Sequence, residues 1–266
     1  MSAEMPYTSA TMADAFDGAY DARPSPTMRR IFHAVYGDDA APDEAAAFNF
    51  VSRSELERVA REVRVGAGQV FADLGCGAGG PGLWVARQTG AQVWGIDLSP
   101  EAIAQATHRA RRQGQTARFA VGDFLATGLP EAQCDAGLSI DALWLAPDKA
   151  LALVEAARIL RPGGRLVCTT WESRLPLPGL PPQAADYQPY LKAAGFETLV
   201  YEETPDWERR QRGVYAGVLA AQEALFQEQG EAAGFMIGEA SLATGLMDGV
   251  DYLAQARRVL IVAERR

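Results

Sequence analysis

The chain has 266 residues, of which 48% are hydrophobic, and its formal net charge is −9 at pH 7. This hydrophobic fraction is ordinary for a globular protein with a substantial core, and no apolar run in the sequence approaches the roughly 18 residues of a membrane span. Because nucleic-acid binding depends on neutralising phosphates with Lys and Arg, the acidic balance argues against a nucleic-acid partner.

The start of the chain and its cysteines indicate the compartment. Glu4 lies where a secretory signal peptide would carry positive charge, so we expect a cytoplasmic protein. Cys76, Cys134 and Cys168 have no paired spacing of the kind that zinc sites or disulfide frameworks show. We therefore expect neither disulfides nor a structural zinc site.

Residues 1–65 show helical patterns and no strand pattern. Between residues 25 and 36, apolar side chains recur at helical spacing, which predicts one helix with a single apolar face. Ser52, with Glu55 three residues later, resembles a capping box and predicts a second helix that runs through Val63. We expect residues 1–65 to form a helical cover over the remaining domain, residues 66–266.

From residue 66 to residue 202, strand and helix patterns alternate, as a doubly wound parallel sheet requires. The expected strands cover residues 69–74, 92–97, 117–121, 135–140, 165–171 and 197–202, and the expected helices cover residues 81–89, 100–113, 148–160 and 186–194. A proline-rich loop at residues 172–182 follows the fifth strand, and its prolines keep it out of the sheet.

Residues 206–250 form a helical insertion before a last strand at residues 258–263. Apolar side chains from Trp207 to Phe226 recur at spacings of three, four and seven, which predicts one long amphipathic helix. A second apolar stripe, from Phe235 to Val250, predicts another helix. We expect these helices to act as a lid over the site, although most of their apolar residues would be ordinary core contacts.

A glycine-rich turn at residues 73–80, with the sequence DLGCGAGG, joins the first expected strand to the next helix. Such a turn lets a ligand approach the backbone, and the helix start offers free N–H groups and a positive dipole end. Glycines 75, 77 and 80 fit the dinucleotide fingerprint G-x-G-x-x-G, which alone is weak. The carboxylate of Asp73 would repel a pyrophosphate, but it suits a ligand with an ammonium group.

The same residues resemble the first motif, D/E-x-G-x-G-x-G, of class I S-adenosylmethionine-dependent methyltransferases. Here the motif consists of Asp73, Gly75, Gly77 and Gly79. The resemblance covers roughly residues 66–202 and includes an L-x-P-G-G turn at residues 160–164, expected before the fifth strand. It implies an α/β fold with a doubly wound, mostly parallel seven-stranded sheet, in which the last strand is antiparallel and lies between strands five and six.

The resemblance also implies which residues contact S-adenosyl-L-methionine. Asp73 and the glycine turn would hold the methionine end, and Asp97 would bind both ribose hydroxyls. Asp123 would hold the adenine amino group, with Phe124 packed against the ring. The further implied contacts are Gly75, Cys76, Gly77, Gly79, Leu98, Ser139, Tyr20 and Ser52. Cys76 is interpreted as a small residue that fits the turn and not as a nucleophile.

Three functions remain open at this point. An NAD-dependent oxidoreductase would also place an acid such as Asp97 about 20 residues after the turn, but it has no reason to carry Asp73, Asp123 and the 160–164 turn together. A methyltransferase-like scaffold repurposed for cyclisation or ligand binding would keep every motif. We favour methyl transfer to a small, fairly hydrophobic metabolite, with oxygen preferred over carbon or nitrogen, in specialised metabolism. Nothing in the sequence indicates an oligomeric state.

The sequence shows no obvious set of catalytic residues, and methyl transfer does not require one. A sulfonium methyl donor is already activated, and orientation alone can supply ~7–11 kcal/mol. Asp141 follows the fourth strand and is a candidate for acid/base help, with helix capping or loop structure as the alternative. His33 lies beside the apolar face of its helix and is either exposed or directed into the pocket. No clustered Asp, Asn and His pattern points to a metal, so none is expected.

Aromatic residues close to the expected site are candidates for the walls of an acceptor pocket. The candidates for pocket walls are Trp144 and Trp171, at the ends of strands four and five. Phe48 and Phe50 precede the core, as aromatic residues do in members of the resembling family whose N-terminal segment closes over the methionine part of the cofactor. Core packing is the alternative for each of them. Glu172, at the end of the fifth strand, is a weaker candidate than Asp141 for acid/base help.

Overall fold

The structure is a computed structural model that describes residues 16–18, 20, 25–45 and 49–266. The described residues form one seven-stranded sheet with the order β3-β2-β1-β4-β5-β7-β6. The strands are β1 (Val70–Leu74), β2 (Gln92–Asp97), β3 (Ala117–Val121), β4 (Cys134–Ile140), β5 (Leu160–Ser173), β6 (Phe196–Glu203) and β7 (Ala256–Arg265). Only β7 is antiparallel to its neighbours, β5 and β6. The predicted sheet, including its last strand, is therefore confirmed.

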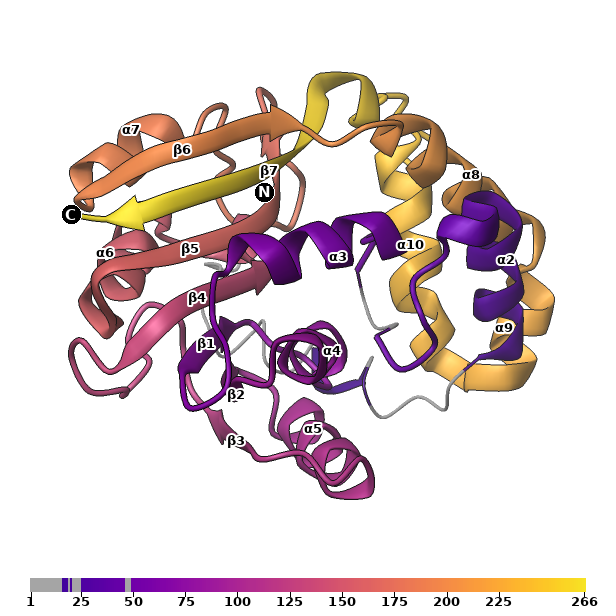
Figure 1. Cartoon of the computed structure of the whole chain (residues 1–266). Helices are drawn as coiled ribbons and strands as arrows, with labels where there is room; N and C mark the ends of the chain where they lie inside the picture. The colour runs from indigo at the N-terminus through magenta and orange to yellow at the C-terminus, as the bar shows by residue number, and fades with distance from the viewer. Residues whose placement is uncertain (1–15, 19, 21–24, 46–48) are drawn as a thin grey trace.

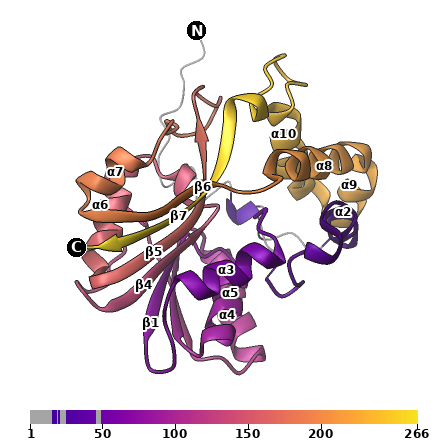
Figure 2. The same cartoon turned by 45° about the horizontal axis from the view of Figure 1, so that its top comes forward.

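Helices cover both faces of this sheet (Figures 1 and 2). One core lies between the sheet and the helices α3 (Arg53–Glu62), α4 (Gly80–Thr89) and α5 (Pro100–Arg112). The other core lies under α6 (Lys149–Ile159) and α7 (Gln188–Ala193). Because both faces are covered, central strands such as β4 are buried over almost their whole length, which explains their nearly continuous apolar sequence.

The helices before β1 begin where the sequence predicts. In α2 (Pro26–Tyr36), the Ser25 hydroxyl accepts a hydrogen bond from the Met28 amide at 3.0 Å, and Pro26 occupies the first turn. In α3, Ser52 and Glu55 form the predicted capping box. However, α3 packs on α4 and the sheet, whereas α2 packs against the inserted helices.

The inserted region differs from the prediction in two places. The first apolar stripe forms two helices, α8 (Trp207–Ala220) and α9 (Gln222–Gln229). Contacts with α2 fix the orientation of α9 separately from that of α8. Glu228 of α9 accepts hydrogen bonds from the Thr27 amide and hydroxyl at 3.1 and 2.7 Å. The second helix, α10 (Ala233–Ala243), ends before Gly245, which adopts a φ of +79°.

Because of this early end, Leu246 and Met247 are exposed and do not extend the apolar stripe of α10. The prediction of a helix running to Val250 was therefore wrong. A smaller difference concerns residues 160–164, which belong to β5 itself. There, the pairing between β4 and β5 is irregular between Cys134 and Ala136, so the L-x-P-G-G segment lies within the strand and not before it.

Figure 1 shows α2, α8, α9 and α10 gathered beyond the carboxyl end of β4. Their shared core is rich in aromatic side chains and includes Tyr36, Trp171, Trp207 and Tyr215. In α/β sheets of this type, ligands bind beyond the carboxyl ends of the strands. The helices are therefore placed where they can roof a ligand site.

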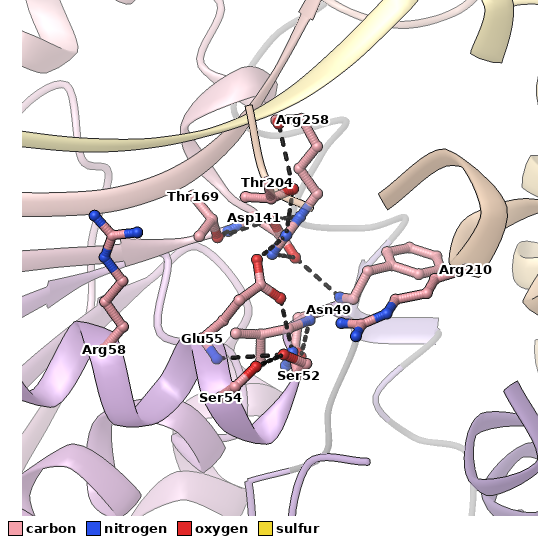
Figure 3. Close-up of polar contacts among 12 residues, drawn as sticks. Asn49, Ser52, Ser54, Glu55, Arg58, Asp141, Thr169, Thr204, Arg210 and Arg258 are labelled. Carbon is pink, nitrogen blue, oxygen red and sulfur yellow. Dashed lines mark hydrogen bonds and ion pairs between the residues drawn. The ribbon is translucent and has the colours of Figure 1, made fainter. Parts of the chain in front are cut away.

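A buried arginine, Arg258, contacts residues from several parts of the chain (Figure 3). Arg258 of β7 is 2% exposed and donates to both carboxylate oxygens of Asp141, at 2.9 and 3.2 Å. It also pairs with Glu55 at the start of α3 and donates to the Thr204 hydroxyl at 3.2 Å. Its guanidinium lies 5.8 Å from the centre of the Trp171 ring. One side chain thus links α3, β4, β5 and β7.

We predict that Arg258→Met lowers the free energy of unfolding by about 3–5 kcal/mol, because it leaves the buried Asp141 carboxylate without its counter-charge. The matched control is Arg209→Met. Arg209 is 63% exposed, and its ion-pair partner in the described part of the chain is Asp206, which is 62% exposed, so we expect a change below about 1 kcal/mol. Urea denaturation measures both values. Similar losses in the two variants would contradict this role for Arg258.

Candidate functional site

The turn between β1 and α4 brings the backbone close to other parts of the chain. Gly75 and Gly77 adopt φ values of +73° and +51°, a region that favours glycine. A Cβ atom on Gly75 would lie 2.5 Å from the Cβ of Ala142, and one on Gly77 would lie 2.2 Å from the Tyr20 hydroxyl. The turn therefore tolerates no side chain at either position and presents bare backbone to its surroundings.

Asp73 lies beside this turn and is 2% exposed. Its Oδ2 atom has no hydrogen-bond partner in the part of the chain that the structure describes. Burial, and then the charge of Asp97, raise the pKa of the Asp73 carboxyl to about 7. A buried, unpartnered carboxylate is costly, and an ammonium group placed next to it would remove that cost. The geometry therefore fits a ligand with a cationic amine.

Asp97 ends the neighbouring strand β2 and faces the same turn. Its two oxygens accept hydrogen bonds from the amides of Gly77 and Ser99, at 2.7 and 3.0 Å. These bonds fix the orientation of the carboxylate, and burial raises the pKa of this group. Because each carboxylate oxygen can accept more than one hydrogen bond, Asp97 can also receive two hydroxyl donors.

Residues after β3 complete this edge of the sheet. The Phe124 ring lies beside Gly75, 3.5 Å from the position that a Cβ would take there. Asp123 accepts a hydrogen bond from the Leu125 amide at 2.8 Å, which holds the loop in place. The structure thus brings Phe124 to the glycine turn, at the same sheet edge as Asp73 and Asp97.

Four further residues that the sequence predicts as cofactor contacts are Ser139, Cys76, Gly79 and Leu98. The buried Ser139 hydroxyl donates to the Leu74 carbonyl at 2.9 Å, which gives it a structural partner. Burial raises the pKa of the Cys76 thiol, so the thiol stays protonated, in line with a space-filling role. Gly79 is the N-cap of α4, and Leu98 is half-buried next to Asp97.

The described N-terminal residues lie across the start of α5. The Asp17 carboxylate accepts a hydrogen bond from the Ser99 hydroxyl, and the Tyr20 carbonyl accepts one from Gln105 at 2.5 Å. This placement brings the Tyr20 hydroxyl over Gly77. Tyr20 therefore lies at the glycine turn, whereas Phe48 is outside the described residues.

Ser52 is placed differently. Its hydroxyl accepts from the Glu55 amide at 3.2 Å and lies 3.0 Å from the Ser54 hydroxyl. Because the side chain is fully buried at the start of α3, its contacts belong to the helix cap. Among the described residues, the hydrogen bonds of Ser52 are made to Ser54 and Glu55 and not to the glycine turn.

The two candidate bases do not have the geometry of a base. The Asp141 carboxylate accepts two hydrogen bonds from Arg258, one from the Thr169 hydroxyl and one from the Phe50 amide. These four donors occupy its acceptor positions, which matches the structural alternative. His33 is 53% exposed, and its imidazole lies 3.5 Å from the exposed Asp43. Asp141 is therefore held by structural contacts, and His33 lies at the surface.

Glu172 is also engaged. Its carboxylate accepts from the Tyr201 hydroxyl and the Tyr187 amide and pairs with Arg257. Among the described residues there is no group of three or more His, Cys, Asp and Glu side chains that could hold a metal ion. In the same residues, no helix combines the length and apolar character needed to cross a membrane.

Sequence reasoning missed three polar residues of the inserted helices: Gln211, Tyr215 and Glu239. They form a hydrogen-bonded chain inside the aromatic core between α8 and α10. A signal was present in the sequence, because Gln211 lies four residues from both Trp207 and Tyr215 on the apolar stripe. A polar residue in that position faces the interior.

The raised pKa of Asp73 makes stability depend on pH. The protonated carboxyl stabilises the fold fully below about pH 4, and this contribution is lost as the pH rises to about 7. We predict that the free energy of unfolding falls by up to about 1.4 kcal/mol per pH unit in this window, and that Asp73→Asn removes this slope. Urea denaturation at several pH values measures it, with Asp206→Asn as the exposed control. Equal slopes in both variants would contradict the prediction.

Comparison with known proteins gives the family. Residues 72–168 match the model of a family described as a methyltransferase domain. The chain is 32% identical to Methyltransferase GfsG of Streptomyces halstedii over 163 residues, 59% of each chain. It is 37% identical over 107 residues to the 2-methyl-6-phytyl-1,4-hydroquinone methyltransferase of Synechocystis sp., 40% of this chain and 33% of that one. Each match spans less than two thirds of the relative's length.

The fold matches over a longer stretch. The crystal structure of the cyclase SpnF superposes with a TM-score of 0.74 over 97% of both chains, at 23% identity, which shows a shared fold alone. The sheet differs from the 3-2-1-4-5-6 order of dinucleotide-binding domains, because β7 lies antiparallel between β5 and β6. Residues 72–168 therefore match a methyltransferase domain, and the curated relatives that the chain resembles over part of their length are methyltransferases.

Proposed function

We propose that this protein binds S-adenosyl-L-methionine at the glycine turn and transfers its methyl group to a small, fairly hydrophobic metabolite. The observation that carries the proposal is the buried Oδ2 atom of Asp73, which has no partner in the described chain. An ammonium group supplies the missing partner, whereas a diphosphate would add a second negative charge. The family match at residues 72–168 supports the same cofactor.

In this proposal each part of the site holds one part of the cofactor. Asp73 pairs with the amine, Asp97 accepts from the ribose hydroxyls, and Asp123 with Phe124 holds the adenine. Tyr20, which lies over Gly77, covers the turn and excludes water. The bound cofactor supplies a methyl group that is already activated by its sulfonium. The protein contributes mainly orientation, which can lower a barrier by ~7–11 kcal/mol.

The surroundings of the site support an apolar acceptor. Phe50 makes edge-to-face contacts with the rings of Trp171 and Tyr215, at centroid distances of 6.2 and 5.7 Å. These residues lie at the carboxyl end of the sheet, where an acceptor would have to bind. The relative from Synechocystis is named for a hydroquinone with a phytyl chain. We propose oxygen as the preferred acceptor atom.

A second function is a scaffold that binds a ligand or promotes a cyclisation without methyl transfer. The specific observation in its favour is the fold match to SpnF, a cyclase. The two functions differ in their products, because only methyl transfer releases S-adenosylhomocysteine. Incubating the protein with labelled cofactor and a panel of hydroxylated apolar acceptors separates them, and labelled methylated products in the panel would support methyl transfer.

We predict that Asp73→Asn weakens S-adenosyl-L-methionine binding by ~1–3 kcal/mol, the scale of a lost hydrogen bond to a charged group. Titration calorimetry measures the affinity, and Asp206→Asn on the exposed surface should bind as the wild type does. Unchanged affinity in Asp73→Asn would contradict the proposed site. Binding of NADH in place of S-adenosyl-L-methionine would contradict the proposed cofactor.

Cofactor binding should also release a proton. With a pKa of about 7, Asp73 is largely protonated at pH 6, and pairing with an ammonium group would lower that pKa. We predict a release of about 0.9 proton at pH 6 that falls towards zero above pH 8. Calorimetry in buffers of different ionisation enthalpy measures the release, which should be absent in Asp73→Asn. Equal proton release by the variant would show that the proton comes from another group.

A further inference from the structure

Three polar side chains meet inside the aromatic core between the inserted helices and the sheet. Gln211 and Tyr215 lie one turn apart on α8, and Glu239 lies on α10. The Gln211 side-chain amide donates to the Tyr215 hydroxyl at 2.5 Å, and that hydroxyl donates to a Glu239 carboxylate oxygen at 2.6 Å. None of these groups is needed to bind the cofactor as proposed above.

The chain of hydrogen bonds leaves one acceptor unused. An ionised carboxylate can only accept, so the Tyr215 proton goes to Glu239 and Gln211 must be the donor to Tyr215. The Gln211 Oε1 atom then has no partner in the described chain, although this side chain is only 4% exposed. Burying an unpaired acceptor destabilises a protein. Its presence therefore points to a donor that arrives with a ligand.

The position of the cluster relative to the sheet fits an acceptor site. Edge-to-face contacts join Tyr215 to Phe50, whose amide donates to Asp141 at the end of β4. On the same face of α8, Trp207 packs edge-to-face on Trp171 of β5, with ring centroids 5.2 Å apart. The cluster thus faces the carboxyl ends of the central strands, where ligands of such sheets bind.

The cluster also adjoins the cover of the glycine turn. Phe235 lies one turn before Glu239 on α10, and its ring is 5.3 Å from that of Phe16. Phe16 belongs to the same N-terminal segment as Tyr20, which lies over Gly77. In addition, α10 is strongly apolar, yet its only buried residues are Ala233 and Ala240. A helix that lines a ligand site, unlike one in a closed core, leaves its apolar side chains partly uncovered.

We propose that Gln211, Tyr215 and Glu239 form the acceptor site and select an apolar molecule that carries hydroxyl groups. Gln211 Oε1 needs a donor, the Glu239 carboxylate repels anions, and the surrounding aromatic core favours an apolar molecule, so the ligand is an uncharged hydroxyl donor. Burial also raises the pKa of Glu239, which makes its carboxylate a stronger base than an exposed one.

The role of Glu239 in the reaction rests on the proposed methyl transfer. The hydroxyl oxygen of the acceptor forms the new bond to the methyl carbon, and its proton passes to the Glu239 carboxylate. The electron pair of the broken carbon–sulfur bond stays on sulfur. Glu239 is therefore the general base in place of Asp141 and His33.

The first test measures selectivity without any cofactor. Equilibrium dialysis compares 2-naphthol with 2-methoxynaphthalene, which has the same ring but no hydroxyl donor. The wild type is expected to prefer the naphthol at least tenfold, and Glu239→Gln and Gln211→Met to lower this preference below threefold. Glu223→Gln, at an exposed position of α9, should keep it. Equal or absent binding of both probes by the wild type, or an unchanged preference in the two variants, would overturn the proposal.

The second test separates a binding role from a structural one. Gln211→Met removes the unpaired acceptor, so the free protein is expected to unfold at a urea concentration no lower than the wild type does. A clear fall in this midpoint would mean that Gln211 mainly supports the fold, and it would overturn the proposal. Glu239→Gln should bind S-adenosyl-L-methionine within threefold of the wild type. If the wild type fails to bind S-adenosyl-L-methionine, the proposed function is overturned. The proposed acceptor site is tested separately, because the preference for 2-naphthol is measured without cofactor.

Discussion

The site depends on a buried negative charge that the protein itself does not neutralise. Asp73 is the second-last residue of β1 and lies close to the first turn of α4, where a Cβ on Gly82 would lie 2.2 Å from its Oδ2 atom. Burial and the charge of Asp97 keep the pKa of this carboxyl raised, and because no described donor reaches the Oδ2 atom, the fold carries a local cost. A cationic ligand that pairs with Asp73 removes this cost. Binding of the cofactor therefore also stabilises the fold.

The surroundings of Asp141 contrast with those of Asp73. Asp141 has the same chemistry as Asp73, but Arg258 neutralises it and four donors surround it. Asp141 adopts a φ of +52° at the end of β4, and the adjacent Ala142 packs against Gly75. Arg258 therefore holds the segment against which the glycine turn rests. Asp73 is therefore available to a ligand, whereas Asp141 stabilises the segment next to the glycine turn.

The sequence patterns predicted correctly those features that depend on residues close to one another in the chain. The seven strands, the capping box of Ser52 and the glycine turn follow from periodicity, helix capping and backbone freedom. The break between α8 and α9 was missed, because it depends on a contact between Glu228 and Thr27, 201 positions away. The ion pair of Asp141 could not be predicted for the same reason, since its partner Arg258 lies 117 positions further along the chain. Gln211 and Glu239 were overlooked because the apolar stripes around them predict core packing.

The most direct test of the account is a crystal structure of the protein with S-adenosyl-L-methionine. The account predicts that the amine lies within hydrogen-bond distance of Asp73 Oδ2 and that both ribose hydroxyls lie on Asp97. A ligand bound elsewhere, or bound with its amine directed away from Asp73, would contradict it.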